Sequence, residues 1–195
     1  MKRLIEIADP VEVAALWSLG HLAGDDIATV SLRWLEADID RGDTDVAALA
    51  GEAHLNLSES GPAFARALRV VAGREVEGDE AVLRALRLHL AWAQGQDDIE
   101  EAVRSILARF VGLSERRLVR NPRRTEDQRD QRYAEDELGL EYVYGLYHEF
   151  DDIGHLSPSA RAAAEANLRA ELREAVVILH DHLSAMLAAG QLSDL

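Results

Sequence analysis

The chain has 195 residues, of which 36 are acidic and 21 basic, so its formal net charge is −15 at pH 7. This charge repels nucleic acid phosphates and anionic membranes and attracts basic partners, so we expect neither nucleic-acid nor membrane binding. The lack of cysteine excludes disulfides, thiolate metal ligands and cysteine nucleophiles. Acids near the N-terminus argue against a signal peptide, and no apolar run approaches membrane-spanning length. We therefore expect a cytoplasmic protein.

Apolar residues recur at helical spacing in six segments of the first 113 residues, each with a residue that starts or stops a helix. Residues 11–19 form the first predicted helix, which ends at Gly20. The second runs from residue 25 to Gly42, and Asp43 or Thr44 caps the third.

The next three segments follow the same pattern. In the fourth, Ser60 is expected to be the N-cap of a helix with Pro62 near its first turn. Asp79 opens the fifth and Asp97 the sixth. Short polar connections between helices of this length favour antiparallel pairs, so residues 1–113 are expected to form an irregular, solenoid-like helical array.

Residues 114–136 interrupt the helical pattern with a basic island. Few of these side chains are apolar, and Asn121 and Pro122 predict a turn. Arginine suits bidentate contacts with carboxylates or phosphates. We favour an exposed connection whose charges neutralise the protein's own acids. The arginines lie at positions 116, 117, 120, 123, 124, 129 and 132.

Residues 137–195 are predicted to form a helical hairpin that packs on the array as part of one structural unit. Within residues 138–153, apolar side chains at spacings of 3, 4 and 3 are typical of one buried helix face. The last helix is expected to begin at Pro158 and end at Gly190. No segment alternates as a strand would, so the predicted fold is all-α. The two apolar seams are Val143, Leu146, Phe150 and Ile153, and Leu168, Leu172, Ala175, Leu179, His182 and Met186.

Histidines and carboxylates on the last two helices make a metal site the first chemical alternative. The best candidate ligands are His148, Asp152, His180 and His182. Their spacing matches neither the Glu-x-x-His pairs of di-iron bundles nor the His-Glu-x-x-His of zinc proteases. His182 falls in the apolar seam, where a core histidine with one hydrogen bond is the commoner case. We expect no metal or cofactor, while a metal-dependent helical-bundle enzyme or ligand-binding protein remains the alternative.

A second cluster consists of Asp38, Asp40, Asp43 and Asp45. It does not fit an EF-hand loop, because counting from Asp38 puts Asp43 where the glycine belongs and a leucine where the final glutamate belongs. A helix end followed by an N-cap explains the spacing without an ion. The cluster nevertheless predicts a negative surface suited to a basic partner.

The penultimate helix supplies the second predicted contact surface. Tyr144 and Tyr147 lie on one side of it, beside His148 and Asp151. Tyrosine is enriched at protein interfaces, so these four residues are expected to touch a partner.

Catalytic motifs are lacking. The serines lie mainly at predicted helix boundaries, where capping explains them, and the only lysine is Lys2. The sequence contains no Gly-x-Ser-x-Gly, phosphate-binding loop or dinucleotide fingerprint. A binding protein is therefore favoured over an enzyme.

Between Leu16 and Ala50, the pattern W-x-x-x-x-L-x-x-x-x-I, followed by Gly-Asp and Val-x-x-Leu-Ala, resembles small bacterial helical immunity families associated with polymorphic toxins. The resemblance covers less than a fifth of the chain. It implies an inhibitor that binds the active surface of a secreted toxin, commonly through acidic residues. The matching positions are Trp17, Leu22, Ile27, Gly42, Asp43, Val46, Leu49 and Ala50.

Charge, composition and resemblance together favour an immunity or antitoxin protein that neutralises a basic toxin domain by occlusion. A scaffold or regulatory adaptor would need the same kind of binding face, so it is kept as a further alternative.

Overall fold

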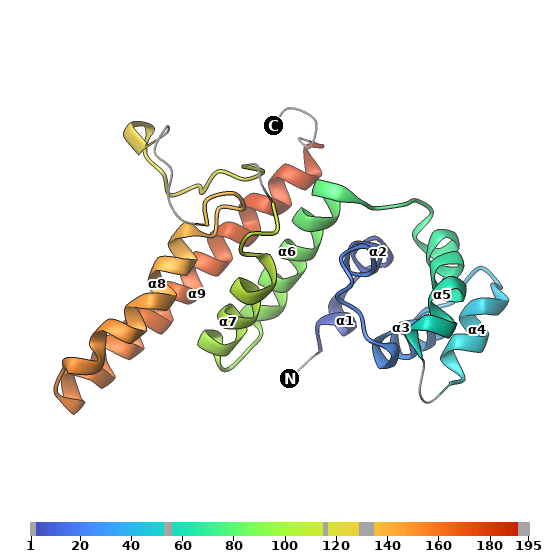
Figure 1. Ribbon diagram of the computed structural model, residues 1–195, viewed down its shortest axis with the longest axis horizontal. Helices are drawn as coiled ribbons and strands as arrows, with labels where there is room; N and C mark the ends of the chain where they lie inside the picture. The colour runs from blue at the N-terminus through green and yellow to red at the C-terminus, as the bar shows by residue number, and fades with distance from the viewer. Residues whose placement is uncertain (1–2, 53–55, 115–116, 129–134, 191–195) are drawn as a thin grey trace. The chain divides into compact units, whose positions relative to one another are not determined.

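The computed structural model describes residues 3–52, 56–114, 117–128 and 135–190. Within these ranges the chain forms α-helices and no strand, apart from one isolated bridge between Val119 and Leu138, so the predicted all-α fold is confirmed (Figure 1). None of the helices in these ranges is both long and apolar enough to cross a membrane. The α-helices are α1 (Leu4–Ile7), α2 (Pro10–Ser18), α3 (Gly24–Glu36), α4 (Thr44–Ala50), α5 (Leu57–Ala72), α6 (Gly78–Gln94), α7 (Ile99–Phe110), α8 (Glu141–Asp152) and α9 (Pro158–Ala188).

The chain divides into two compact units, Lys2–Ala85 and Leu86–Leu195, and the boundary between them lies within α6. Both units are acidic. The N-terminal unit has 16 acidic and 8 basic residues, and the C-terminal unit has 20 acidic and 13 basic residues. The solenoid-like detail and the division at residues 113 and 136 stay predictions.

The N-terminal unit is built around Phe64 of α5, which is completely buried. Trp17 of α2 meets it edge-on, with ring centroids 5.2 Å apart, and Trp34 of α3 stacks parallel to it at 5.8 Å. Aromatic pairs in these geometries stabilise beyond the area that they bury. One ring therefore joins three helices of this unit.

Helix α3 ends earlier than the sequence predicts. Its last residue is Glu36 rather than a residue near Gly42, because Asp38 adopts a left-handed conformation with φ of 56°. The amides of Asp38 and Ile39 turn back to the carbonyls of Leu35 and Trp34, at 3.0 and 3.1 Å. This Schellman arrangement satisfies the last carbonyls and stops the helix, and aspartate is one of the few residues that tolerates the conformation.

The N-caps of α5 and α7 also differ from the predicted residues. Helix α5 begins at Leu57, with Asn56 rather than Ser60 as its cap, because the Asn56 side chain accepts from the Ser58 amide at 3.0 Å. Pro62 consequently lies inside the helix. Helix α7 is capped by Asp98, one residue after the predicted cap, through a 3.1 Å bond from the Glu101 amide.

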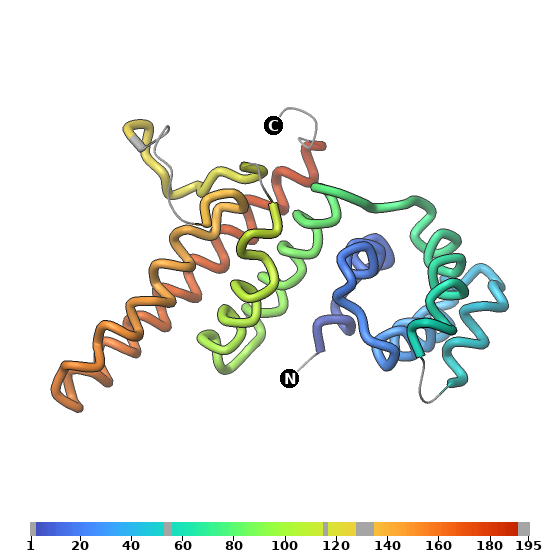
Figure 2. The backbone as a smooth tube through the Cα atoms, in the orientation of Figure 1, coloured from blue at the N-terminus to red at the C-terminus, as the bar shows by residue number. Residues whose placement is uncertain are grey.

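The C-terminal unit is organised by the hairpin of α8 and α9, which lie side by side (Figure 2). Helix α7 contacts both of them. The predicted seam of α9 is buried throughout except at His182, which is half-buried. The α8 seam is buried at Val143 and Leu146 and half-buried towards its C-terminal end.

The prediction of an exposed connection at residues 114–136 is wrong in part: Arg120, Pro122 and residues 125–127 are exposed, but other residues of the segment are buried. Leu118 and Val119 are buried, and both of their amides donate to the carbonyl of Glu137, at 2.7 and 3.1 Å. Gly139 fixes this return with φ of 70°, since a Cβ there would lie 3.3 Å from Leu179 of α9. The segment is thus folded onto the hairpin. Arg116, Arg129 and Arg132 lie outside the described residues.

Candidate functional site

The structure brings the predicted acids together in the connection between α3 and α4. Asp38 is exposed, whereas Asp40 is half-buried and its Oδ2 accepts a 3.0 Å hydrogen bond from the Gly42 amide. Left-handed backbone at Asp38, Arg41 and Gly42 makes this connection a sequence of tight turns. The two carboxylates are therefore held on a defined backbone.

Asp43 and Asp45 both have structural roles, of which the sequence predicts only the capping role of Asp43. Asp43 is the N-cap of α4, and its carboxylate accepts from the amides of Asp45 and Val46 at 2.8 and 3.1 Å. Asp45 receives two hydrogen bonds from Arg66 of α5, at 2.8 and 3.2 Å. This pairing raises the pKa of Arg66, chiefly through the hydrogen bond to Asp45. Asp38 and Asp40 are consequently the members of the cluster that remain for a partner.

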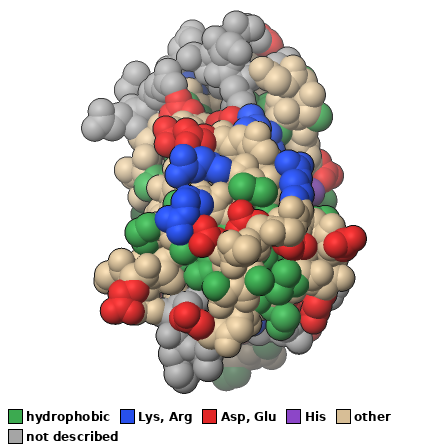
Figure 3. Space-filling model, turned by 90° about the vertical axis from the view of Figure 1, so that its right-hand side faces the viewer, with side chains coloured by type: hydrophobic (Ala, Val, Ile, Leu, Met, Phe, Trp, Pro, Cys, Tyr) green, Lys and Arg blue, Asp and Glu red, His purple; other side chains and the backbone are tan. Residues whose placement is uncertain are grey.

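Apolar side chains are exposed on α3 and just after it. Leu32 of α3 is 47% exposed, and Ile39, just after α3, is 38% exposed. Figure 3 views the molecule from the side on which α4 and α5 lie, and acidic, basic and apolar side chains alternate on that face. The acidic connection is therefore one local surface rather than part of a continuous acidic sheet.

The predicted contact surface on α8 is assembled as a compact cluster. The ring of His148 lies 4.3 Å from that of Tyr144 and 5.4 Å from that of Tyr147, centroid to centroid. Nδ1 of His148 lies 3.7 Å from a carboxylate oxygen of Asp151. The two tyrosines are half-buried, while His148 and Asp151 are exposed. We call these four residues the α8 aromatic surface.

The candidate metal ligands do not meet. His180 contacts Asp181, its neighbour on α9, with Nδ1 2.9 Å from a carboxylate oxygen. Burial lowers the pKa of His182, although a hydrogen bond with the carbonyl of Arg120 opposes the shift. Asp152 is exposed at the end of α8. Over the ranges that the structure describes, no three His, Asp or Glu side chains are placed to hold a metal ion.

Arginines of the folded segment are bound to the protein's own acids. Arg124 is 5% exposed, and it donates to Asp136 at 3.0 Å and to Glu141 at 2.8 Å. Arg117 also pairs with Asp136. Burial works against the Arg124 charge, yet Asp136 and Glu141 hold its pKa above the usual value. Burial raises the pKa of Glu141, although Arg124 opposes the rise.

Arg123 completes this arrangement. Its guanidinium pairs with Glu174 of α9 at 3.0 Å and lies 4.4 Å from the ring centroid of Tyr142. Arg117, Arg123 and Arg124 thus neutralise the protein's own acids, as the sequence indicates, but from a partly buried segment rather than from a solvated linker; Arg120 is exposed.

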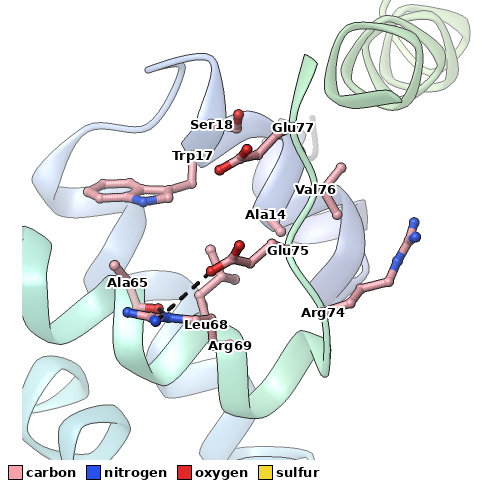
Figure 4. A pocket seen from close by; sticks show the side chains of 10 residues that line it. All are labelled: Ala14, Trp17, Ser18, Ala65, Leu68, Arg69, Arg74, Glu75, Val76 and Glu77. Carbon is pink, nitrogen blue, oxygen red and sulfur yellow. Dashed lines mark hydrogen bonds and ion pairs between the residues drawn. The ribbon is translucent and has the colours of Figure 1, made fainter. Parts of the chain in front are cut away.

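A pocket that the sequence does not identify lies in the N-terminal unit, between α2, α5 and the chain that leaves α5. Its volume is about 510 Å³, within the range of small-ligand pockets. Trp17 and Ser18 come from α2, and an Arg69–Glu75 ion pair at 4.0 Å lies on the other side (Figure 4). The lining residues are Ala14, Trp17, Ser18, Ala65, Leu68, Arg69, Arg74, Glu75, Val76 and Glu77.

Sequence spacing alone could not have located this pocket. Trp17 reads as the apolar end of a short helix, and residues 73–77 read as a polar connection. The signal that was present is Val76, an apolar residue between Glu75 and Glu77, which is 3% exposed. Because Val76 is buried, it fixes the position of the connection after α5, and Glu75 and Glu77 on either side of it line the pocket.

No family model, curated protein or solved structure matches this chain. The function is therefore inferred from the geometry of these surfaces and from charge.

Proposed function

We propose that this chain is an acidic protein-binding protein of the immunity or antitoxin kind, which neutralises a basic protein partner by covering its active surface. The observation that carries the proposal is the α8 aromatic surface. Tyr144 and Tyr147 pack around His148 on a single helix, and the outer side of the cluster is exposed at His148 and Asp151.

This arrangement has the composition of an interface centre. Tyrosine combines a large apolar ring with a polar hydroxyl, and it fixes few rotatable bonds when a partner binds. The contacts of His148 with both tyrosine rings restrict the cluster before binding, which lowers the entropy cost of association. Asp151 adds a carboxylate at the edge, where it favours a cationic neighbour.

Charge determines the kind of partner. Both units carry an excess of acids, and Arg117, Arg123 and Arg124 pair with the protein's own carboxylates. Asp38 and Asp40 provide a second negative surface on the N-terminal unit. Opposite charge accelerates association and disfavours acidic competitors, so a basic protein is the expected partner.

Capture from an extract of the source cells tests the proposal. Tagged full-length protein is expected to retain a basic protein in stoichiometric amount, and Tyr147→Ala with His148→Ala should reduce the retained amount about tenfold or more. Val177→Ala is the matched control, because Val177 is a 40% exposed apolar residue of α9 outside the cluster. Thermal melts followed by circular dichroism verify that each variant is folded.

The captured protein then distinguishes an immunity protein from an adaptor. A toxin expressed alone should arrest growth, and co-expression of this chain should relieve the arrest. Retention of no basic protein, or equal retention by the wild type and the double variant, contradicts the proposal.

A further inference from the structure

The pocket of the N-terminal unit has an apolar interior beside an aromatic wall. Ala14, Leu68 and Val76 are each no more than 5% exposed. Trp17 is half-buried and is held against Phe64, with Gly61 of α5 close to the edge of its indole. The indole therefore presents a fixed surface to the pocket rather than a mobile one.

The charges around the pocket leave one carboxylate uncompensated. Arg74 pairs with Glu80, which also accepts from Nε of Arg84 at 2.6 Å, and Figure 4 shows the Arg74 guanidinium turned away from the indole. Arg69 and Glu75 offset each other at 4.0 Å.

Glu77 differs from these residues. Its side chain is exposed, and its carboxylate pairs with no other residue in the described part of the chain. In Figure 4 this carboxylate is directed towards Trp17 and Ser18, at the mouth of the pocket. An uncompensated carboxylate next to an indole is an arrangement that favours a cation.

We infer that this pocket binds an arginine side chain of the basic partner, and this inference rests on the proposed function. The guanidinium would stack on Trp17 and pair with Glu77, while its aliphatic stem packs on Ala14, Leu68 and Val76. Tryptophan is the strongest aromatic partner of a cation. Arginine is favoured over lysine because its planar guanidinium stacks on an aromatic ring and bonds a carboxylate in a bidentate manner.

The competing occupant is an anion held by Arg69 and Arg74. The interactions of Arg74 with Glu80 and of Arg69 with Glu75 weaken this alternative, since an anion would have to displace both carboxylates. A cationic probe and an anionic probe distinguish the two occupants.

The test is a nuclear magnetic resonance titration of the ¹⁵N-labelled full-length protein, in which each of the 3 tryptophans gives one indole N–H signal. Trp17→Phe assigns the Trp17 signal, and Trp34 and Trp92 signals that remain well dispersed show that this variant is folded. The probes are Nα-acetyl-arginine amide, its neutral isostere Nα-acetyl-citrulline amide, and Nα-acetyl-glutamate amide. A saturable shift of the Trp17 signal is expected with the arginine probe, and it should be at least about threefold weaker with the citrulline probe.

Variants of the pocket acid provide the second arm. Glu77→Gln should weaken binding of the arginine probe about two- to fivefold, whereas Glu52→Gln, an equal change of charge at an exposed residue of the same unit, should leave it unaltered. Equal responses to arginine and citrulline, no response, or a stronger response to glutamate would each overturn the inference.

The titration contains no partner protein, so its outcome is separate from that of the capture experiment. Failure of the arginine probe together with capture of a basic protein would remove the pocket from the interface and leave the proposed function standing. Failure of the capture experiment would remove the proposed function, whatever the probe does.

Discussion

Nε of Arg124 lies 2.8 Å from Oε1 of Glu141, and the two side chains are only 5% and 11% exposed. This ion pair fastens the arginine-rich segment to the first turn of α8, the helix that carries the α8 aromatic surface. The positive charge of Arg124 is therefore buried. It does not reduce the negative charge of the protein surface at this position.

Loss of the Arg124 guanidinium should be strongly destabilising. Arg124→Met leaves Glu141 buried without its ion-pair partner, while Asp136 keeps Arg117. Breaking one side of a buried pair costs about 3 kcal/mol or more. We expect a loss of this size in the free energy of unfolding, measured by urea denaturation.

Arg161→Met is the control for this prediction. Arg161 also pairs with a glutamate, Glu165, at 2.9 Å, but its side chain is 52% exposed. Its removal should cost less than about 0.5 kcal/mol. Similar losses in the two variants would show that the Arg124 network does not hold the segment in place.

The aspartates of the α3–α4 connection should respond differently to substitution. Asp43→Ala removes the N-cap of α4 and should lower the free energy of unfolding by about 1 kcal/mol. Asp38→Asn should change stability by less than about 0.5 kcal/mol, because asparagine also tolerates the left-handed backbone at this position. Thermal melts of the two variants at equal salt measure the difference. Equal costs would contradict the assignment of Asp43 as a structural residue.

His182 should make the protein less stable as the pH falls. Its pKa is lowered by burial, so the unfolded chain takes up a proton near the ordinary value of 6.5 while the folded chain takes it up only at lower pH. The unfolded state therefore binds more protons in this interval, and acidification from about pH 7.5 to about pH 5.5 favours unfolding.

The variant His182→Gln should lose less stability over this pH interval than the wild type. His155→Gln is the matched control, because His155 is exposed, and it should keep the wild-type dependence. Urea denaturation at several pH values gives the slopes. The same slope for all three proteins would show that His182 does not titrate differently in the two states.

Helical periodicity was sufficient to predict the all-α fold and the two apolar seams of the C-terminal hairpin. Capping residues and prolines predict several helix starts correctly, including Asp43 before α4 and Pro158 at the start of α9. They failed where adjacent polar residues compete for the same role. Asn56 rather than Ser60 caps α5, since side chains of both types accept amide hydrogen bonds and sequence alone does not rank them.

The remaining differences between prediction and structure arise from contacts between residues that are distant in the sequence. The charge of residues 117–124 predicts a solvated segment. Three of its arginines, however, pair with carboxylates from other segments of the chain, namely Asp136, Glu174 and Glu141. Burial of an arginine depends on such partners and not on its neighbours in the chain. The pocket beside Trp17 eluded prediction for the same reason. By contrast, the proximity of the four side chains of the α8 aromatic surface is predictable from the sequence, because they lie within eight residues of one helix.

The salt dependence of association with the captured partner tests the central claim most directly. Raising the ionic strength from about 0.05 to about 0.5 M shortens the Debye length from about 14 to about 4 Å. If charge steers the complex, the association rate constant should fall about tenfold or more, while the dissociation rate constant changes much less. At low salt, Asp38→Asn with Asp40→Asn should also slow association while keeping the local backbone geometry, and Glu52→Gln with Glu59→Gln should have a smaller effect. An association rate that stays constant across this salt range would contradict recognition of a basic partner by an acidic surface.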